Sequence, residues 1–225
     1  MQPFRDREDA GRQLAQRLDR YSGNRDVIVL ALPRGGVPVG FEVAARLGAP
    51  LDVLVVRKLG VPGHSELAMG AIASGGIRVV DQRVINVLDV SRAAFEAVLA
   101  EERAELERRD REFRAGRPPL DVTGRIAIVV DDGLATGATM AAAVDALRTR
   151  APARIVVAVP VAPPDTCEML GRRADEVTCL ITPRQMYAVG AWYEDFTQTS
   201  DDEVHALLEA ARDFGTAVPA EAASP

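Results

Sequence analysis

Short apolar runs alternate with amphipathic segments along most of this chain. Runs long enough for strands, and too apolar to face water on one side, occupy 26–32, 51–58, 125–130, 154–161 and 176–181. Segments with helical periodicity lie between and around them, over 6–21, 39–47, 91–114, 138–150, 165–173 and 201–214. This alternation predicts an α/β fold with a mainly parallel central sheet of about five strands, flanked by helices.

One segment interrupts the alternation. LGVPGHSELAMGAIASGG (59–76) is rich in glycine and lacks a clear period, so we expect a long flexible loop over about 58–78 with one short strand at 68–73. The charged helix at 91–114 is expected to present a solvated face. Residues 215–225 are rich in Ala and Pro and are expected to form a disordered tail, which leaves one domain over 1–214.

Composition and charge exclude several function classes. Hydrophobic residues make up 48% of the chain and aromatic residues only 4%, which suits an Ala/Val/Leu-rich sheet with helices. A net charge of −6 and a pI near 5.1 argue against broad attraction to nucleic acid or an anionic membrane. The sequence has neither an apolar run of about 18 residues nor an apolar N-terminal signal segment. We therefore expect a cytoplasmic protein with no nucleic-acid or membrane partner.

The two cysteines give little signal. Cys167 and Cys179 lack C-x-x-C spacing, and two thiols are too few for a metal cluster or a disulfide framework. The sequence therefore does not favour a disulfide between them.

The segment VVDDGLATGATM (129–140) carries the strongest chemical signal. Its strand ends in Asp131 and Asp132, and because isolated buried charges are costly, these carboxylates should meet water, a cation or ligand hydroxyls. Gly133 and Gly137 permit close backbone approach, and the N–H groups at the start of the following helix attract phosphate. Acidic and phosphate-binding features side by side fit a sugar phosphate.

This segment resembles the signature of the type I phosphoribosyltransferases that binds phosphoribosyl pyrophosphate (PRPP), two acidic residues followed by x-x-x-T-G-x-T. The order of elements over about 26–181 is also similar, which implies the family's fold with a small hood. A Walker A loop is the nearest rival, but no G-K-[ST] follows the glycines. On the resemblance, the residues that bind PRPP are Asp131, Asp132, Gly133, Leu134, Ala135, Thr136, Gly137, Ala138 and Thr139.

The family's activity is then the expected one. PRPP and Mg²⁺ would transfer a phosphoribosyl group to a nitrogen acceptor, a nucleobase in this family, with release of pyrophosphate. Mg²⁺ would be held mainly through PRPP, with Asp131 and Asp132 as nearby candidate ligands.

A second segment, Pro33-Arg34-Gly35-Gly36, follows the first strand, where the family places its pyrophosphate loop. There a non-proline cis peptide often turns amides toward the leaving group. The resemblance implies that Arg34, Gly35 and Gly36 bind pyrophosphate, and that Arg34 neutralises it as it leaves. An ordinary turn with a surface arginine is the alternative.

Lys58 and His64 resemble residues of the family's flexible catalytic loop, most nearly in the orotate branch. Together with Arg34 they are the candidate catalytic residues, because closing such a loop adds positive charge beside the departing pyrophosphate. Lys58 could equally be a surface lysine.

MYAVGAWYEDF (186–196) resembles the hood that hypoxanthine-guanine phosphoribosyltransferases lay over the base, here about 183–199. The match implies base contacts from Tyr187, Val189 and Glu194. Trp192 and Tyr193 could instead be core or interface aromatics.

Two departures leave the acceptor open. The hypoxanthine-guanine branch has a catalytic Asp where this chain has Ala135, and its base-reading lysine has no counterpart in VPVAPPDT (159–166). A homodimer is an open expectation.

Two other function classes remain. A non-catalytic sensor of PRPP or nucleotides would keep 131–139 but could dispense with Arg34 and Lys58, whose presence favours the enzyme. Another α/β enzyme with a phosphate ligand rests on fold analogy alone.

Overall fold

A computed structural model describes residues 3–114 and 118–215. The expected tail beyond Gly215 lies outside the described residues, and so do 1–2 and 115–117. Within the described ranges, no helix is both long and apolar enough to cross a membrane.

Five parallel strands form the main sheet, in the order β2-β1-β6-β7-β8. They are β1 (Val27–Ala31), β2 (Leu51–Val53), β6 (Ile126–Val130), β7 (Arg154–Val161) and β8 (Glu176–Ile181). Each neighbouring pair is parallel, with β1 between β2 and β6. The predicted α/β fold with a mainly parallel sheet of about five strands is therefore confirmed.

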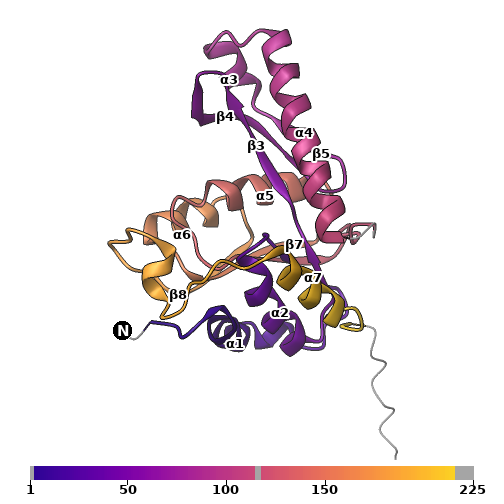
Figure 1. Cartoon of the computed structure of the whole chain (residues 1–225), viewed down its shortest axis with the longest axis vertical. Helices are drawn as coiled ribbons and strands as arrows, with labels where there is room; N and C mark the ends of the chain where they lie inside the picture. The colour runs from indigo at the N-terminus through magenta and orange to yellow at the C-terminus, as the bar shows by residue number, and fades with distance from the viewer. Residues whose placement is uncertain (1–2, 115–117, 216–225) are drawn as a thin grey trace, which may run out of the picture.

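Helices cover both faces of this sheet (Figure 1). On one face lie α1 (Arg7–Arg17) and α2 (Gly36–Leu47), and on the other α5 (Ala138–Arg148) and α6 (Pro164–Gly171). Successive residues of a strand point to opposite faces, so Val27 packs toward α1 and α2 while Ile28 packs toward α5. Because both faces are buried at the centre of the sheet, β1 and β6 are apolar throughout.

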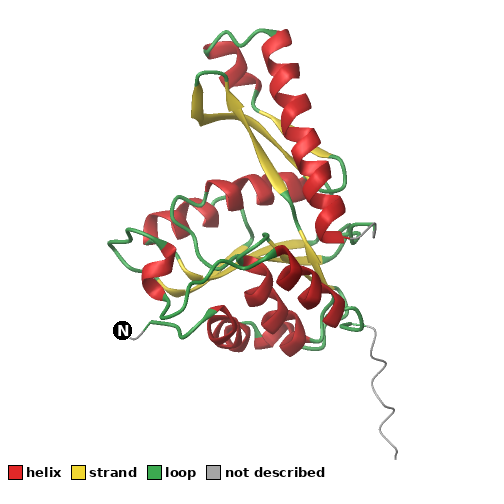
Figure 2. Ribbon diagram, in the orientation of Figure 1, coloured by secondary structure: helices red, strands yellow, loops and turns green. Residues whose placement is uncertain are grey.

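The segment expected to be a loop is instead a second sheet. A three-stranded antiparallel sheet, β3-β4-β5, consists of β3 (Val56–Val61), β4 (His64–Ala73) and β5 (Ile77–Val80). It rises from the main sheet beside α3 (Gln82–Val87) and the long α4 (Arg92–Arg114), as Figure 2 shows. The loop prediction for 59–76 was wrong, and the expected short strand at 68–73 is part of β4.

Tertiary packing explains why the segment 59–76 forms strands rather than the expected loop. Leu59, Met69 and Ile72 are buried against Phe95 and Leu99 of α4. The apolar stripe of the charged helix thus covers one face of the small sheet, which a reading of α4 as a solvated face missed. Antiparallel backbone pairing accommodates the glycines that disguised the strands, with register shifts on either side of Gly60.

The strand expected at 51–58 is divided between the two sheets. Its first residues form β2, and the chain then turns at Leu54 and Val55 into β3. The Ser74 hydroxyl accepts from the Val55 amide at 3.0 Å, and the Ser74 amide donates to the Val55 carbonyl at 2.9 Å. This contact fixes the base of the small sheet.

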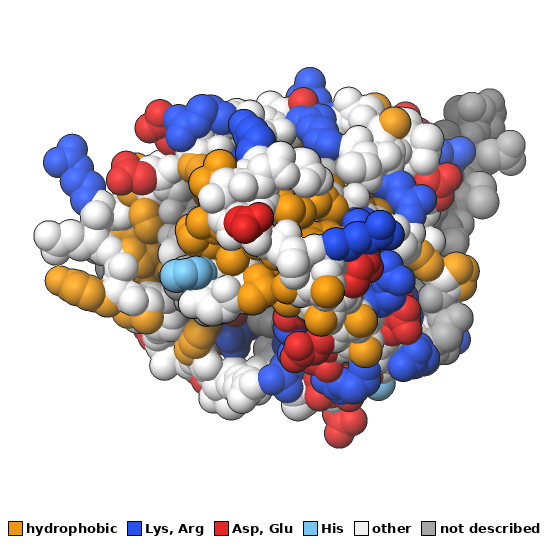
Figure 3. Space-filling view, turned by 90° about the horizontal axis from the view of Figure 1, so that it is seen from above, with side chains coloured by type: hydrophobic (Ala, Val, Ile, Leu, Met, Phe, Trp, Pro, Cys, Tyr) orange, Lys and Arg blue, Asp and Glu red, His pale blue; other side chains and the backbone are white. Residues whose placement is uncertain are grey.

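The last helix, α7 (Asp201–Ala210), contacts both α2 and α4 and so joins the two parts of the molecule. At the outer end of the small sheet, hydrophobic side chains remain at the surface among charged ones (Figure 3). Leu67, Val87 and Leu88 are the exposed large hydrophobic residues there.

Candidate functional site

The loops after β1 and β6 meet at the carboxyl edge of the main sheet. The two strands are paired in parallel, so the segments that follow them leave the sheet side by side. The Leu32 amide donates to the Val130 carbonyl at 2.9 Å, which continues the ladder one residue beyond β1. The predicted pyrophosphate loop and the predicted acid pair are therefore neighbours.

Two glycines allow this close approach. A Cβ at Gly35 would overlap the carboxylate of Asp132, and one at Gly36 would lie 2.8 Å from the Val130 carbonyl oxygen and 3.0 Å from the Cα of Asp131. Gly35 itself has a right-handed helical backbone (φ −59°), so what excludes a side chain here is space. The loop of residues 32–36 packs directly on the acid pair.

Asp131 is held in a largely buried position. Burial raises its pKa well above the usual 3.8, and the neighbouring charge of Asp132 raises it further. The Asp132 amide donates to Oδ1 of Asp131 at 2.9 Å and partly offsets this effect. Asp131 therefore gains from any ligand that donates hydrogen bonds to its carboxylate or brings a positive charge close to it.

Asp132 has a cationic partner from the first helix. The Arg7 Nε donates to Oδ2 of Asp132 at 2.8 Å, and the side chains of Arg7 and Asp132 are only 11% and 14% exposed. Burial raises the pKa of Asp132, whereas the Arg7 hydrogen bond and charge lower it. The same guanidinium donates to the Thr197 carbonyl at 2.7 Å and stacks 3.9 Å from the ring centroid of Phe196.

The segment after the acid pair crosses the sheet edge and starts α5. At Gly133 a Cβ would approach Val189 Cγ1 to 2.5 Å, and Gly137, with φ +69°, occupies the left-handed region that favours glycine. The Leu134 side chain is buried in the core, so only its backbone can face a ligand. Ala135, Thr136, Ala138 and Thr139 are exposed in front of the amides at the helix start.

Arg34 lies in the loop of residues 32–36, after a cis peptide bond between Pro33 and Arg34. The sequence resemblance included that feature. The Arg34 guanidinium pairs with Asp201 at the start of α7, 3.6 Å away, and the side chains of Arg34 and Asp201 are 37% and 42% exposed. The loop that carries Arg34 thus packs on the acid pair, while the Arg34 side chain is held toward α7.

Lys58 and His64 do not share one place. Lys58, on β3, lines a pocket of about 770 Å³ together with Thr136 and Ala138 of the loop before α5, so it faces the predicted phosphate site. His64 begins β4 beside the turn of the hairpin, where it pairs with Val61, and is not among the residues that line this pocket. Lys58 and His64 therefore lie on strands rather than on the expected basic loop. Of these two residues, Lys58 lines the pocket in front of the loop before α5 and His64 does not.

The predicted hood, 183–199, covers the Asp132 end of the site. It contains the short 3₁₀ helix η2 (Val189–Trp192), and Val189 packs against Gly133 as described above. The Tyr187 side chain is 93% exposed, and Glu194 is exposed as well. Of the three predicted base contacts, only Val189 therefore touches the acid-pair segment.

Tyr193 fixes the predicted hood to the site. Its hydroxyl donates to the Asp132 carbonyl at 2.5 Å, and its ring lies 5.4 Å from that of Phe4. The ring is buried, which agrees with the alternative expectation of a core aromatic. Its burial and the nearby Asp132 charge raise the pKa of the phenol.

Arg7 is the site residue that the sequence analysis missed. It sits in a run of alternating charges, RDRED (5–9), where every residue looks like part of a solvated helix face. Nothing local distinguishes Arg7 from Arg5, because the property that matters is contact with a residue 125 positions away.

Carboxylates at the site are few. Among the side chains that the structure describes, no group of three or more His, Cys, Asp or Glu residues could hold a metal ion. Asp131 and Asp132 are adjacent acidic side chains at the sheet edge. This donor set suits a Mg²⁺ ion whose remaining ligands come from a bound phosphate compound and water.

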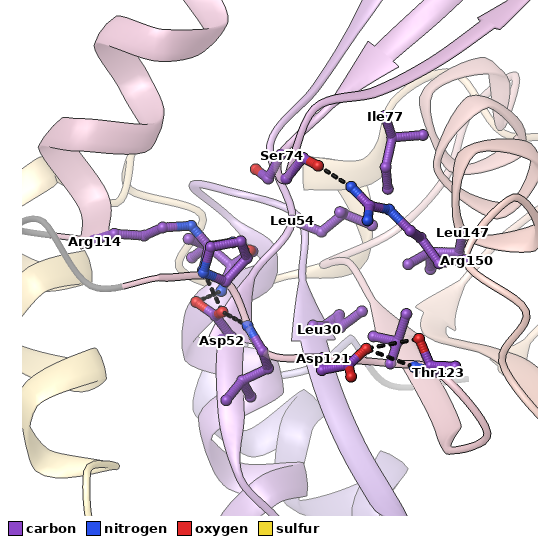
Figure 4. A pocket seen from close by; sticks show the side chains of 15 residues that line it. Leu30, Asp52, Leu54, Ser74, Ile77, Arg114, Asp121, Thr123, Leu147 and Arg150 are labelled. Atoms are coloured by element: carbon purple, nitrogen blue, oxygen red, sulfur yellow. Dashed lines mark hydrogen bonds and ion pairs between the residues drawn. The ribbon is translucent and has the colours of Figure 1, made fainter.

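A second pocket, of about 410 Å³, lies away from this edge, between the turn after β4, the end of α5 and residues 119–123 (Figure 4). Its charged groups are paired within the protein. Arg114 pairs with Asp52 and Asp110, Arg150 donates to the Gly75 carbonyl, and Asp121 accepts from Thr123. The pocket is better explained by the junction of the two sheets than by a ligand.

Comparison with known proteins shows a match to one protein-family model over most of the chain. The family model described as "Phosphoribosyl transferase domain" matches residues 4–191. A Mycobacterium tuberculosis protein named "Putative phosphoribosyl transferase" is 54% identical over 225 residues, all of this chain and 51% of that protein. The chain spans about half the length of this relative.

Two further relatives are similar. The "Bifunctional protein PyrR" of Chloroflexus aurantiacus is 32% identical over 149 residues, which are 61% of this chain and 72% of that protein. The crystal structure of the Thermus thermophilus protein TT1426 is 44% identical, with a TM-score of 0.84 over 92% of this chain and 98% of that chain. This architecture is therefore shared, over 92% of the chain, by a solved structure.

Proposed function

This chain belongs to the phosphoribosyl transferase domain family, and from that premise we propose that it transfers the phosphoribosyl group of PRPP to a nitrogen acceptor and releases pyrophosphate. The observation that carries the proposal is the packing of Gly35 and Gly36 on Asp131 and Asp132. A loop suited to pyrophosphate and an acid pair suited to ribose hydroxyls lie together at one sheet edge.

The acid pair and the loop before α5 would hold the sugar phosphate. Asp131 and Asp132 accept hydrogen bonds from the ribose hydroxyls, which offsets the cost of burying their charge. Residues 135–139 offer backbone amides and exposed hydroxyls to the 5′-phosphate. The ribose is thereby fixed with its anomeric carbon toward the loop of residues 32–36.

Charge on the leaving group is the main chemical problem. Arg34 turns from Asp201 to the pyrophosphate, and Lys58 approaches it from β3. Mg²⁺ would be held mainly by PRPP, beside Asp131 or Asp132, and when bound it would supply further positive charge. The carboxylates also stabilise the positive charge that develops on the ribose ring as the bond to pyrophosphate breaks.

The acceptor that we propose is a nucleobase nitrogen, placed under the segment 183–199. Val189 already contacts the acid-pair segment, and the exposed ring of Tyr187 is available to stack on a base. Glu194 could accept from the edge of the base. A homodimer stays a prediction.

The first test measures ligand binding without knowledge of the acceptor. At 100 times its dissociation constant, PRPP with Mg²⁺ should add about 2.7 kcal/mol to the free energy of unfolding and raise Tm by roughly 5–11 °C. The double variant Asp131→Asn/Asp132→Asn should lose this shift, whereas Glu107→Gln, on the exposed face of α4, should keep it. A full shift in the double variant, or an equal shift with ATP and Mg²⁺, contradicts the proposed ribose contacts.

The second test measures catalysis. PRPP and Mg²⁺ are incubated with a panel of nucleobases and related amines, and pyrophosphate release is recorded. Release that depends on one acceptor supports the transferase. Binding of PRPP without release for any acceptor favours the sensor instead.

A further inference from the structure

Cys167 and Cys179 face each other between α6 and β8. Their Sγ atoms are 2.7 Å apart, although the residues are separated by twelve positions in sequence and lie on different elements. Both are free thiols in the structure, and both side chains are partly buried at the edge of the main core. Their spacing in sequence does not favour a disulfide, and no disulfide joins them in the structure, but the fold brings the two thiols together.

We propose that Cys167 and Cys179 are a redox modification site, at which a hydroperoxide converts the two thiols into an intramolecular disulfide. A disulfide requires side chains that point at each other from backbones already close enough to be bridged. The facing sulfur atoms meet this requirement, and β8 and α6 are in direct contact.

The reaction balances with hydrogen peroxide as the oxidant. The hydrogen bond from Cys179 lowers the pKa of Cys167, so Cys167 is the sulfur that attacks the peroxide oxygen. One water is released, and Cys167 becomes a sulfenic acid. The Cys179 sulfur then attacks the Cys167 sulfur, the S–S bond forms, and the displaced hydroxide takes the Cys179 proton and leaves as a second water.

The helix that carries Cys167 also supports the loop before α5. The adjacent Thr166 hydroxyl donates to the Ala135 carbonyl at 2.8 Å. A Cβ at Gly137 would lie 2.7 Å from Thr166 Cγ2 and 3.2 Å from Met169 Cε, so α6 is in close contact with this turn. A covalent bond from α6 to β8 fixes the helix against which the predicted 5′-phosphate loop rests.

The bond itself is tested on the full chain, without any substrate. The protein is treated with hydrogen peroxide, denatured, alkylated with iodoacetamide and digested for mass spectrometry. We expect a cross-linked peptide pair containing both cysteines, short of two hydrogen atoms, and its loss after dithiothreitol. A ring of this length should raise Tm by roughly 6–12 °C, or less if bonding strains the helix.

Serine variants separate the two steps. In Cys179→Ser, the Cys167 sulfenic acid should persist and be trapped by dimedone, whereas Cys167→Ser should react little with peroxide. Alkylation of both wild-type thiols after peroxide treatment, or bonds only between separate chains, would overturn the proposal.

The effect of the disulfide on the loop before α5 rests on the proposed function, and it is tested by a separate measurement of PRPP binding. PRPP with Mg²⁺ should bind the oxidised protein a few-fold more tightly than the reduced protein, because the bond restrains α6, which supports the loop before α5, and so lowers the entropy that binding costs. Cys179→Ser should show no such gain. Equal affinity in both redox states overturns the link to the loop, while a bond that forms in a protein with no PRPP response counts against the proposed function alone.

Discussion

Two ion pairs near the sheet edge differ in the distance between their partners and in the burial of their side chains. On the proposed ribose side, Arg7 and Asp132 are 2.8 Å apart with side chains 11% and 14% exposed. On the proposed pyrophosphate side, Arg34 and Asp201 are 3.6 Å apart with side chains 37% and 42% exposed. One pair is part of the folded core around the site, and the other is a surface contact.

The difference indicates how the two sides should behave. A buried pair is costly to break, since removal of one partner leaves a charge without compensation in a poorly solvated place. An exposed pair contributes little, because water and salt screen it. We therefore expect the ribose side to be set before a ligand arrives, and Arg34 to exchange Asp201 for a ligand at small cost.

The largest effect is expected from Arg7→Gln. The variant leaves the buried Asp132 carboxylate without its cation and should lower the free energy of unfolding by roughly 3 kcal/mol. For a chain of this size Tm should fall by about 6–12 °C in a thermal melt. Arg12→Gln on the same helix, whose pairs with Glu8 and Glu42 are more exposed, should cost less than about 1 kcal/mol. Equal losses would remove the distinction between the two sides.

Arg34→Ala and Lys58→Ala should act on turnover rather than on stability. If both side chains meet the pyrophosphate, the stronger contributor should lower kcat/KM by roughly 10²-fold, which corresponds to about 2.7 kcal/mol. Tm should change little, because the Arg34 pair is exposed. Arg103→Ala, an exposed arginine on α4, serves as the control. Unchanged turnover in both variants would favour the sensor.

The stability of the protein should depend on pH through the buried carboxyl of Asp131. Its pKa in the folded protein lies above the usual 3.8, so the folded state holds this proton more tightly than the unfolded state does. The ionised group therefore lowers stability as pH rises above 3.8 through the folded pKa. Asp131→Asn should be more stable than the parent at pH 7, and this gain should disappear near pH 4.

Urea unfolding of the parent and Asp131→Asn across this pH range provides the measurement. A gain that stays constant with pH would show that Asp131 is not the titrating group. Binding of PRPP to the parent should weaken as the pH falls from 7 to 4, because a protonated carboxyl is a poorer acceptor for ribose hydroxyls.

The smallest effect is expected from Asp201→Asn, which releases Arg34. Tm should change by no more than about 2 °C, since the pair is exposed, and KM for PRPP should fall slightly. Asp202→Asn, in the same first turn of α7, controls for the loss of a charge from the helix start. A marked loss of turnover in Asp201→Asn alone would mean that Asp201 orients Arg34 rather than restraining it.

The main sheet was predictable because its strands are buried on both faces. Runs such as IAIVV (126–130) contain enough apolar residues to mark a central strand without tertiary information. The small sheet was not predictable in the same way. Its glycines hide the alternation, and Met69 and Ile72 become core residues only when α4 packs on them.

The site divides along similar lines. Asp131, Asp132 and the loop to Gly137 are contiguous in sequence, so one motif contains them. Arg7 and the Cys167–Cys179 pair depend on contacts between distant segments, and neither has a local pattern. Lys58 lies on β3 rather than on the expected loop, and because that strand is fixed by its antiparallel pairing, sequence alone did not show that Lys58 lines a pocket together with Thr136.

The contact between Arg7 and Thr197 has a consequence for biosynthesis. Arg7 is synthesised before the strands of the main sheet, but Phe196 and Thr197, which hold its guanidinium, emerge after the whole of that sheet. Until they emerge, the guanidinium that pairs with Asp132 lacks its contacts with the Thr197 carbonyl and the Phe196 ring. A nascent chain stalled before residue 196 can therefore contain all strands of the two sheets and both loops of the site. Its site is still incomplete, because the contacts that hold Arg7 in place are missing.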